Sequence, residues 1–146
     1  MIDIEDNNSS LKIVFSKNIT KTIDKLLKSE NKSRGQLCIV LCDDSDLLAI
    51  NKKHLDHDYF TDIITFNYND KNVVSGDLFI SVERVQENAK NYGYSFENEI
   101  IRVIFHGLLH LCGYNDKTNL EKVVMRFKEN FYLNKFVSRE TLVSVK

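Results

Sequence analysis

Residues 96–116 read FENEIIRVIFHGLLHLCGYND, a stretch that predicts a long helix, a glycine at its end and a short acidic turn. Apolar side chains cover nearly the whole circumference of a helix over Phe96 to Cys112. The exception is one polar stripe, formed by Glu99, Arg102, His106 and His110. A helix that is apolar almost all round is buried in the fold. Its two histidines therefore share the only polar stripe of an otherwise buried helix.

The spacing of these histidines predicts a metal site. His106 and His110 are four residues apart, so their imidazoles lie on one face, about one turn from each other. Gly113 can take the left-handed conformation that ends a helix, and the chain then turns back and brings Asp116 toward both histidines. Two imidazoles and one carboxylate with an open fourth position match a catalytic zinc site. The alternative is an exposed helix face that carries two incidental histidines.

Two residues beside the histidines do not fit roles at this site. Cys112 lies about 240° around the helix from His106, so it points away from the metal unless the helix has already unwound there. A zincin protease carries glutamate directly after its first histidine as general base, whereas this sequence has Gly107. Peptidase chemistry therefore lacks its usual base.

The rest of the chain alternates between predicted strands and helices before it becomes helical. Strands are predicted over 11–15, 36–42, 61–68 and 73–81, the last two joined as a hairpin, and helices over 19–27, 44–50 and 82–92. A last helix is predicted from Thr118 to about Phe136, since Thr118 and Glu121 have capping-box spacing, and no strand is expected after Val82. Residues 1–146 thus predict one α+β domain, a four-stranded mixed sheet covered by about five helices.

Composition limits the classes of function. The chain has 146 residues, 42% of them hydrophobic and 28% charged, which is ordinary for a globular domain. No apolar run approaches a membrane span, and the start MIDIEDNNSS lacks the regions of a signal peptide, so we expect a cytoplasmic protein with no membrane partner. Three cysteines without a CxxC pair suit a reducing compartment and read as buried small side chains.

The charge balance offers no overall attraction to nucleic acid, because 20 basic and 21 acidic residues give a formal charge of −1. A nucleic-acid partner must therefore meet a local basic patch. One candidate is the lysine series of the first quarter, from Lys12 to Lys32, and a second is the cluster of Lys52, Lys53, His54 and His57. Such lysines are more often simply solvated. We predict RNA contact at Lys52 and Lys53, with the first helix as the next candidate.

Three motifs resemble the YbeY family of metal-dependent bacterial endoribonucleases. HGLLHLCGYND over 106–116 resembles the family signature H-G-x-L-H-L-x-G-Y-D-H. NKKHLDHDYFTDIITF over 51–66 resembles the block L-N-x-x-Y-R-x-x-D-x-P-T-D-V-L-S-F, with matches at Asn51, Asp58, Thr61, Asp62 and Phe66. GDLFIS over 76–81 resembles the strand G-D-I-x-I-S. The likeness spans residues 48–116, and the two ends of the chain match only in general character.

The resemblance implies a zincin-like domain with one metal ion, zinc by preference. It also implies a single-strand-specific endoribonuclease that matures ribosomal RNA, notably the 3′ end of the small-subunit RNA, and acts in ribosome quality control. The implied partners are ribosomal RNA and the small ribosomal subunit. The remaining alternatives are a metal-dependent hydrolase of another substrate class and a non-catalytic, metal-stabilised ribosome-binding factor.

Carried over by position, His106 and His110 match the first two metal ligands of the family, and Asp116 stands where the pattern has a third histidine. Carboxylate in that place makes the site harder and leaves the native metal open. His106 and Asp77 are the implied catalytic residues, although Asp77 reads equally well as a polar residue at a strand start.

Two further positions are ambiguous. Asp62 either orients a metal-bound histidine or caps a turn. Leu55 occupies the place of the family arginine thought to act on the scissile phosphate. The missing charge could come from Lys52, Lys53, His54 or Arg102.

Overall fold

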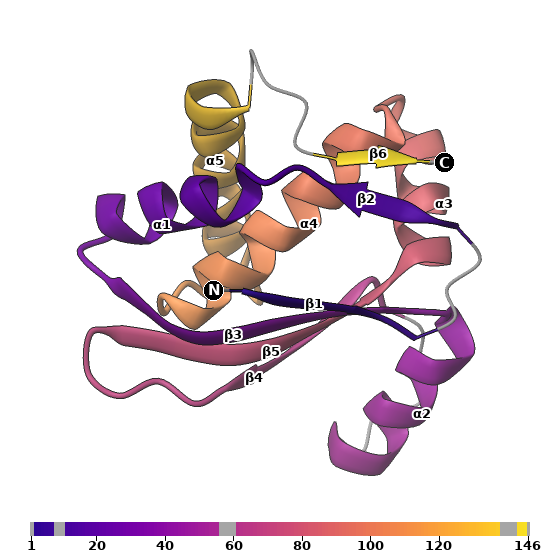
Figure 1. Cartoon of the computed structure of the whole chain (residues 1–146), viewed down its shortest axis with the longest axis horizontal. Coiled ribbons are helices and arrows are strands. Elements are labelled where there is room, and N and C mark those ends of the chain that lie inside the picture. The colour runs from indigo at the N-terminus through magenta and orange to yellow at the C-terminus, as the bar shows by residue number, and fades with distance from the viewer. Residues whose placement is uncertain (1, 8–10, 56–60, 138–142, 146) are drawn as a thin grey trace.

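A four-stranded sheet forms one side of the molecule (Figure 1). The computed structural model describes residues 2–7, 11–55, 61–137 and 143–145. The sheet has the strand order β1 (Asp3–Asp6), β3 (Ser33–Cys42), β5 (Val73–Ser81) and β4 (Ile63–Asn67). The first three strands are parallel, whereas β4 pairs antiparallel with β5 as a hairpin. The predicted mixed sheet of four strands is confirmed.

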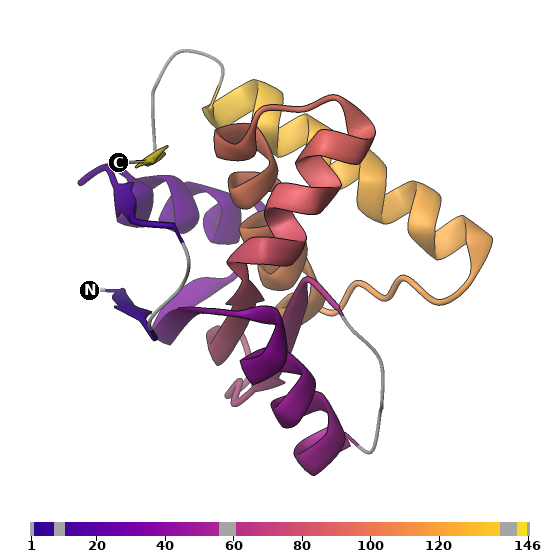
Figure 2. The ribbon, with the colours of Figure 1, turned by 90° about the vertical axis from the view of Figure 1, so that its right-hand side faces the viewer.

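The helix α4 (Phe96–Leu111) is the centre of the fold, and eleven of its sixteen residues are buried. The sheet covers one side of α4, and a two-stranded ribbon of β2 (Ile13–Phe15) and β6 (Val143–Val145) covers the other (Figure 1). The helices α1 (Ile19–Ser29), α3 (Val82–Tyr92) and α5 (Asn119–Phe136) pack around it (Figures 1 and 2). This enclosure explains why the sequence of α4 is apolar nearly all round.

The opposite face of the sheet carries α2 (Asp44–Leu55) and a second, smaller core. Leu47 of α2 packs there with Cys42 and Ile64. Because side chains alternate along a strand, neighbouring residues of β5 face opposite sides. Gly76 faces α4, where a Cβ would lie 3.1 Å from the Leu111 side chain, so Asp77 faces away from α4.

Three strand predictions were wrong. The strand predicted over 11–15 is not in the main sheet but pairs with β6, and β6 itself lies beyond Val82, where no strand was expected. The sheet instead takes its edge strand from β1, in a segment that the sequence presents as acidic and polar. An edge strand with mostly exposed side chains needs no apolar run, so hydrophobic periodicity does not reveal it.

The predicted ends of α3, α4 and α5 are confirmed, whereas the helix predicted over 44–50 continues to Leu55 as α2. Thr118 caps α5 in a full capping box with Glu121, and Ser95 caps α4 by accepting a hydrogen bond from the Asn98 amide. Gly113 takes the left-handed conformation after α4, with a φ of 108°. Within the described residues, none of the helices is long and apolar enough to cross a membrane.

All three cysteines are free thiols. Cys42 is buried, whereas Cys38 and Cys112 are half-buried. Burial, with nearby carboxylates, raises the pKa of Cys42 to about 12, and burial raises that of Cys112 to about 11. Cys112 is not in the group of side chains close enough to share an ion with His106 and His110, in line with the sequence prediction.

Candidate metal centre

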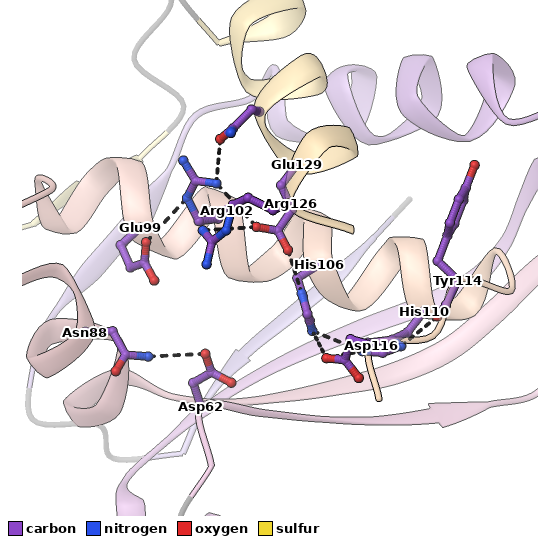
Figure 3. Close-up of polar contacts among 11 residues, drawn as sticks. Asp62, Asn88, Glu99, Arg102, His106, His110, Tyr114, Asp116, Arg126 and Glu129 are labelled. Atoms are coloured by element: carbon purple, nitrogen blue, oxygen red, sulfur yellow. Dashed lines mark hydrogen bonds and ion pairs between the residues drawn. The ribbon is translucent and has the colours of Figure 1, made fainter. Parts of the chain in front are cut away.

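The structure brings together the three residues predicted as metal ligands (Figure 3). His106 Nε2 lies 3.0 Å from His110 Nε2, and Asp116 Oδ2 lies 3.1 Å from the first and 3.3 Å from the second. Both histidines come from the last two turns of α4, one turn apart. Among the described residues, this is the only group of three or more His, Cys, Asp or Glu side chains close enough to share an ion.

The turn after α4 delivers Asp116 to the histidines. The Gly113 amide donates to the His110 carbonyl at 3.0 Å, and the Tyr114 amide donates to the Leu109 carbonyl at 3.0 Å. These bonds fold the chain back over the end of the helix. The left-handed φ of Gly113 makes this reversal possible, as the sequence predicts.

Each histidine is oriented through its Nδ1 atom. His106 Nδ1 lies 2.6 Å from Glu129 Oε2, and His110 Nδ1 lies 2.8 Å from the carbonyl oxygen of Tyr114 (Figure 3). A carboxylate and a carbonyl only accept, so both Nδ1 atoms carry a proton, and each ring in its neutral form keeps a lone pair on Nε2. Two such lone pairs and one carboxylate oxygen therefore point at the same place, an arrangement that favours a cation.

The distances suit a divalent metal. With bonds of about 2.0–2.1 Å and tetrahedral angles, ligand atoms lie about 3.3–3.4 Å apart. The three separations of 3.0, 3.1 and 3.3 Å come within a few tenths of an ångström of that spacing. Histidine nitrogens with a carboxylate oxygen suit zinc and related ions, and the carboxylate also accommodates harder ions such as manganese.

Glu129 is a member of this site that sequence reasoning missed. It is only 3% exposed, and it also pairs with Arg102 Nη1 at 3.3 Å and Arg126 Nη1 at 3.4 Å. Burial alone would lower the pKa of His106, but Glu129, with Asp62 and Asp116, outweighs burial and raises it. The available signal was a carboxylate on the apolar stripe of α5, between Met125 and Leu133.

A cleft with two arms lies beside His106, His110 and Asp116, which are called the metal group below, and the two arms join there. The α2 arm has a volume of about 420 Å³ and is lined by Asn51, Leu55, Thr61, Asp62, Ile63, Ile64, Thr65, His106, His110 and Asp116. The α3–α5 arm has a volume of about 300 Å³ and is lined by Asp62, Asn88, Tyr92, Glu99, Arg102, Val103, His106, Asp116, Lys122, Met125, Arg126 and Glu129. Only Asp62, His106 and Asp116 line both arms, so these residues mark the junction.

Asp62 is at the junction but does not orient a histidine, since both Nδ1 atoms have other partners. Its side chain accepts a hydrogen bond from Asn88 Nδ2 at 3.3 Å, and its carbonyl accepts from the Ser81 amide at 2.9 Å (Figure 3). Burial raises the pKa of the Asp62 carboxyl above its ordinary value, although the charge of His106 opposes this shift. The orienting role considered for Asp62 therefore belongs to Glu129.

Other residues singled out in the sequence lie away from the metal group. Asp77 lines a separate hollow on the opposite face of the sheet, with Glu5, Cys38, Val40 and Phe79. The catalytic role predicted for Asp77 does not fit this placement, because the sheet separates it from the histidines. Among the charges considered as a substitute for the family arginine, Lys52, Lys53 and His54 line neither arm, and Arg102 is held by Glu129 and by Asn130 Oδ1 at 2.8 Å.

Leu55 does lie in the cleft, in the α2 arm with the metal group, and it is 40% exposed. The place matched to the family arginine is thus next to the site and is occupied by an apolar side chain. Asp58 and His57, which the sequence analysis also named, lie outside the described residues.

Gly107 shows why no glutamate follows His106. A Cβ at this position would lie 2.6 Å from Ile63 Cδ1 and 2.8 Å from Leu78 Cδ2, so residue 107 faces the sheet and has no room for a side chain. Because α4 packs so closely against the sheet here, the position that carries the general base in zincin proteases cannot carry a glutamate in this protein.

The family model and the curated relatives that match this chain carry the same family name. A family model described as Endoribonuclease YbeY matches residues 1–137. Proteins named Endoribonuclease YbeY from Flavobacterium psychrophilum and Flavobacterium johnsoniae are 45% and 47% identical, over 78% and 76% of this chain and 81% and 80% of their own lengths. A solution structure of a Thermotoga maritima protein shares the fold, with a TM-score of 0.63 at 23% identity over 97% of this chain and 95% of the other.

Proposed function

The chain belongs to the endoribonuclease YbeY family, and we propose that it cleaves single-stranded ribosomal RNA with one metal ion held by His106, His110 and Asp116. Members of this family are hydrolases that act on RNA phosphodiester bonds, and an endoribonuclease role in ribosomal RNA processing follows from membership. The observation that supports the metal assignment is the convergence of two Nε2 lone pairs and one carboxylate oxygen at separations near 3 Å.

The metal proposed for this site is zinc, although the donor set also admits other divalent ions. When bound, it would neutralise charge that develops on the phosphoryl oxygens and lower the pKa of a water molecule to roughly 7. His106 and His110 hold it through Nε2, and Glu129 fixes the ring of His106 through Nδ1. His106 thus acts in catalysis as a ligand.

Proton transfer at the junction is assigned to Asp62. It lines both arms of the cleft beside His106 and Asp116, where an RNA strand that enters one arm and leaves by the other must pass. We assign no part of the reaction at the metal to Asp77.

The proposed fold type is a zincin-like domain, and the proposed partner is the ribosome. A helix with both histidine ligands that lies across a mixed sheet supports a zincin-like domain, and one core that runs from Ile2 to Val143 supports a single metallohydrolase domain over 1–146. The small ribosomal subunit is the proposed partner and the 3′ end of its RNA the proposed target, which places the reaction in the cytoplasm. A role in ribosome quality control is part of the same proposal.

One observation favours a second candidate, a non-catalytic ribosome-binding factor. Leu55 leaves the α2 arm without the family arginine, and the cations named in the sequence analysis do not replace it there. In that case the metal would only stabilise the end of α4 and the turn after it.

Metal content and cleavage test both candidates. Purified wild-type protein should contain about one zinc or similar ion per chain. The His106→Ala, His110→Ala double variant should lose it, and Asp116→Ala should bind it more weakly. Metal-loaded wild type should cleave single-stranded ribosomal RNA and leave a peptide substrate intact. Full occupancy in the double variant would contradict the ligand assignment, and metal binding without RNA cleavage would favour the binding factor.

A further inference from the structure

We propose that the α3–α5 arm is a nucleotide-binding subsite for single-stranded RNA, in which Tyr92 stacks on a base and Lys122 and Arg126 bind backbone phosphates. The inference rests on the proposed function, because it places substrate in the cleft that contains the metal group. These contacts lie on α3 and α5, whereas the sequence predicts RNA contact at Lys52 and Lys53.

The helices α3, α4 and α5 pack side by side (Figure 2). Residues spaced at about one helical turn on these helices line most of the arm. The floor is α4, with Glu99, Arg102, Val103 and His106. One wall is α3, with Asn88 and Tyr92, and the other is α5, with Lys122, Met125, Arg126 and Glu129. Such i, i+3 and i, i+4 sets lie on one face of each helix, so the three faces form a continuous surface that leads to His106.

The aromatic wall suits a base. Tyr92 is 64% exposed although it lines the arm, so most of its ring is available to a ligand. Stacking of bases on exposed aromatic rings is the main sequence-tolerant contact of single-stranded RNA with proteins. Neighbouring Tyr94 is also exposed, but its ring already lies 5.0 Å from the Arg102 guanidinium.

The opposite wall suits phosphates. Lys122 and Arg126 are one turn apart on α5 and both are exposed, so they place two positive charges at the mouth of the arm. Arg126 makes a single ion pair among the described residues, with Glu129 at 3.4 Å, and half of its side chain remains accessible. Four carboxylates line the deeper part of the arm, Asp62, Glu99, Asp116 and Glu129, so phosphates away from the metal group are favoured at this basic mouth.

The floor offers hydrogen bonds to the base. Glu99 and Arg102 are 4% and 6% exposed, and both line the arm. Glu99 Oε1 and Arg102 Nε form an ion pair at 3.6 Å, but neither atom has a hydrogen-bond partner among the described residues. A buried acceptor and a buried donor without hydrogen bonds are costly, and the polar edge of a base could satisfy them. Tyr92, the floor and the basic mouth together define one nucleotide site.

Binding of a labelled single-stranded RNA of about twelve nucleotides tests Tyr92. Anisotropy would be measured with the full chain in chelator, where no cleavage occurs, and KM and kcat with the metal-loaded protein. Tyr92→Ala should raise Kd and KM by roughly five- to 100-fold, with little change in kcat, and Tyr92→Phe should retain wild-type values. The matched control is Tyr68→Ala, which removes a tyrosine that is 61% exposed and lines neither arm.

The salt dependence of binding tests the two cations. The Lys122→Gln, Arg126→Gln variant should flatten the slope of log Kd against log salt by about 1.4, at roughly 0.7 for each phosphate. The control variant Lys71→Gln, Lys135→Gln removes two exposed charges that line neither arm and should keep the wild-type slope. Tyr92→Ala should keep that slope too, because it removes no charge.

The outcomes separate this inference from the proposed function. Wild-type Kd in Tyr92→Ala together with a wild-type slope in the α5 variant would overturn the inference, even if the protein cleaves RNA. A slope reduced only in Lys52→Gln, Lys53→Gln would overturn it in favour of α2. Weaker binding in Tyr92→Ala would support it even if no metal restored cleavage.

Discussion

At the scale of single residues, Glu129 determines how His106 presents its free nitrogen. The Glu129 carboxylate accepts from His106 Nδ1 at 2.6 Å and is almost fully buried. Carboxylates in this position fix the ring and make the ligand nitrogen more basic, and their loss typically costs about 10–100-fold in metal affinity. Glu129→Ala should therefore weaken metal binding by that factor, as measured by competition with a chelator of known affinity.

Two further variants make this result interpretable. Glu129→Gln retains an oxygen that can accept from Nδ1 but loses the charge, so its affinity should fall between those of Glu129→Ala and wild type. Glu87→Ala removes an exposed glutamate of α3 that lines neither arm and should bind metal normally. If Glu129→Ala kept wild-type affinity, the helix alone would orient His106.

The contrast between Asp116 and Glu129 shows what sequence can predict at this scale. The ligands lie within eleven consecutive positions, so helical geometry and one glycine were enough to place them. Glu129 comes from the next helix, and its approach depends on how α5 packs against α4. Spacing along the chain carries no information about that packing.

At the scale of elements, Glu30 joins the end of α1 to the metal-site turn and to α5. Its carboxylate accepts from Tyr114 Oη at 2.7 Å, from Lys128 Nζ at 3.2 Å and from Tyr132 Oη. Burial alone would raise the pKa of Glu30, but the three donors and the Lys128 charge outweigh burial and lower it. Tyr114 also accepts from His110 Nδ1 through its carbonyl, so Glu30 supports the turn that holds Asp116.

Loss of this carboxylate should make stability depend less on pH. A depressed pKa in the folded state stabilises the protein above the unfolded pKa of about 4.3, and this contribution is lost as pH falls through the folded pKa. Glu30→Gln should thus lower the free energy of unfolding by about 1–3 kcal/mol at pH 7, with a smaller difference at pH 3. Urea unfolding at pH 7 and pH 3 would measure the difference in the free energy of unfolding between wild type and Glu30→Gln, with Glu87→Gln as the control. An equal difference in stability at the two pH values would contradict the lowered pKa of Glu30 in the folded state.

The strands show where element prediction reaches its limit. The strands β3, β4 and β5 carry apolar or β-rich runs and were predicted close to their observed bounds. The short β1 and β2 have exposed or half-exposed side chains, and each is fixed only by a partner distant in sequence, β3 for one and β6 for the other. Local pattern cannot choose between such partners, which is why β2 was placed in the wrong sheet.

At the scale of the whole molecule, the sheet separates Asp77 from the two histidines, although the resemblance assigns His106 and Asp77 to one catalytic site. The histidines and the two-armed cleft lie on the α4 face, whereas Asp77 and its hollow lie on the other. The resemblance associates Asp77 with a functional cleft, but alternation along β5 turns its side chain away from α4. The motifs therefore predicted the grouping of His106, His110 and Asp116, and only the three-dimensional structure could separate Asp77 from that group.

The metal should stabilise the whole fold without being required for it. Most of α4 is buried between the sheet and the β2–β6 ribbon, and this core does not involve the ligands, so metal-free protein should keep its far-ultraviolet circular dichroism. Metal binds only where His106, His110 and Asp116 converge in the folded state, which stabilises that state by about 2.7 kcal/mol at 100 times Kd. For a domain of this size, Tm should fall by about 5–10 °C when a chelator is added. The His106→Ala, His110→Ala variant should not respond to chelator, and an equal fall in that variant would show that the stabilising ion binds elsewhere.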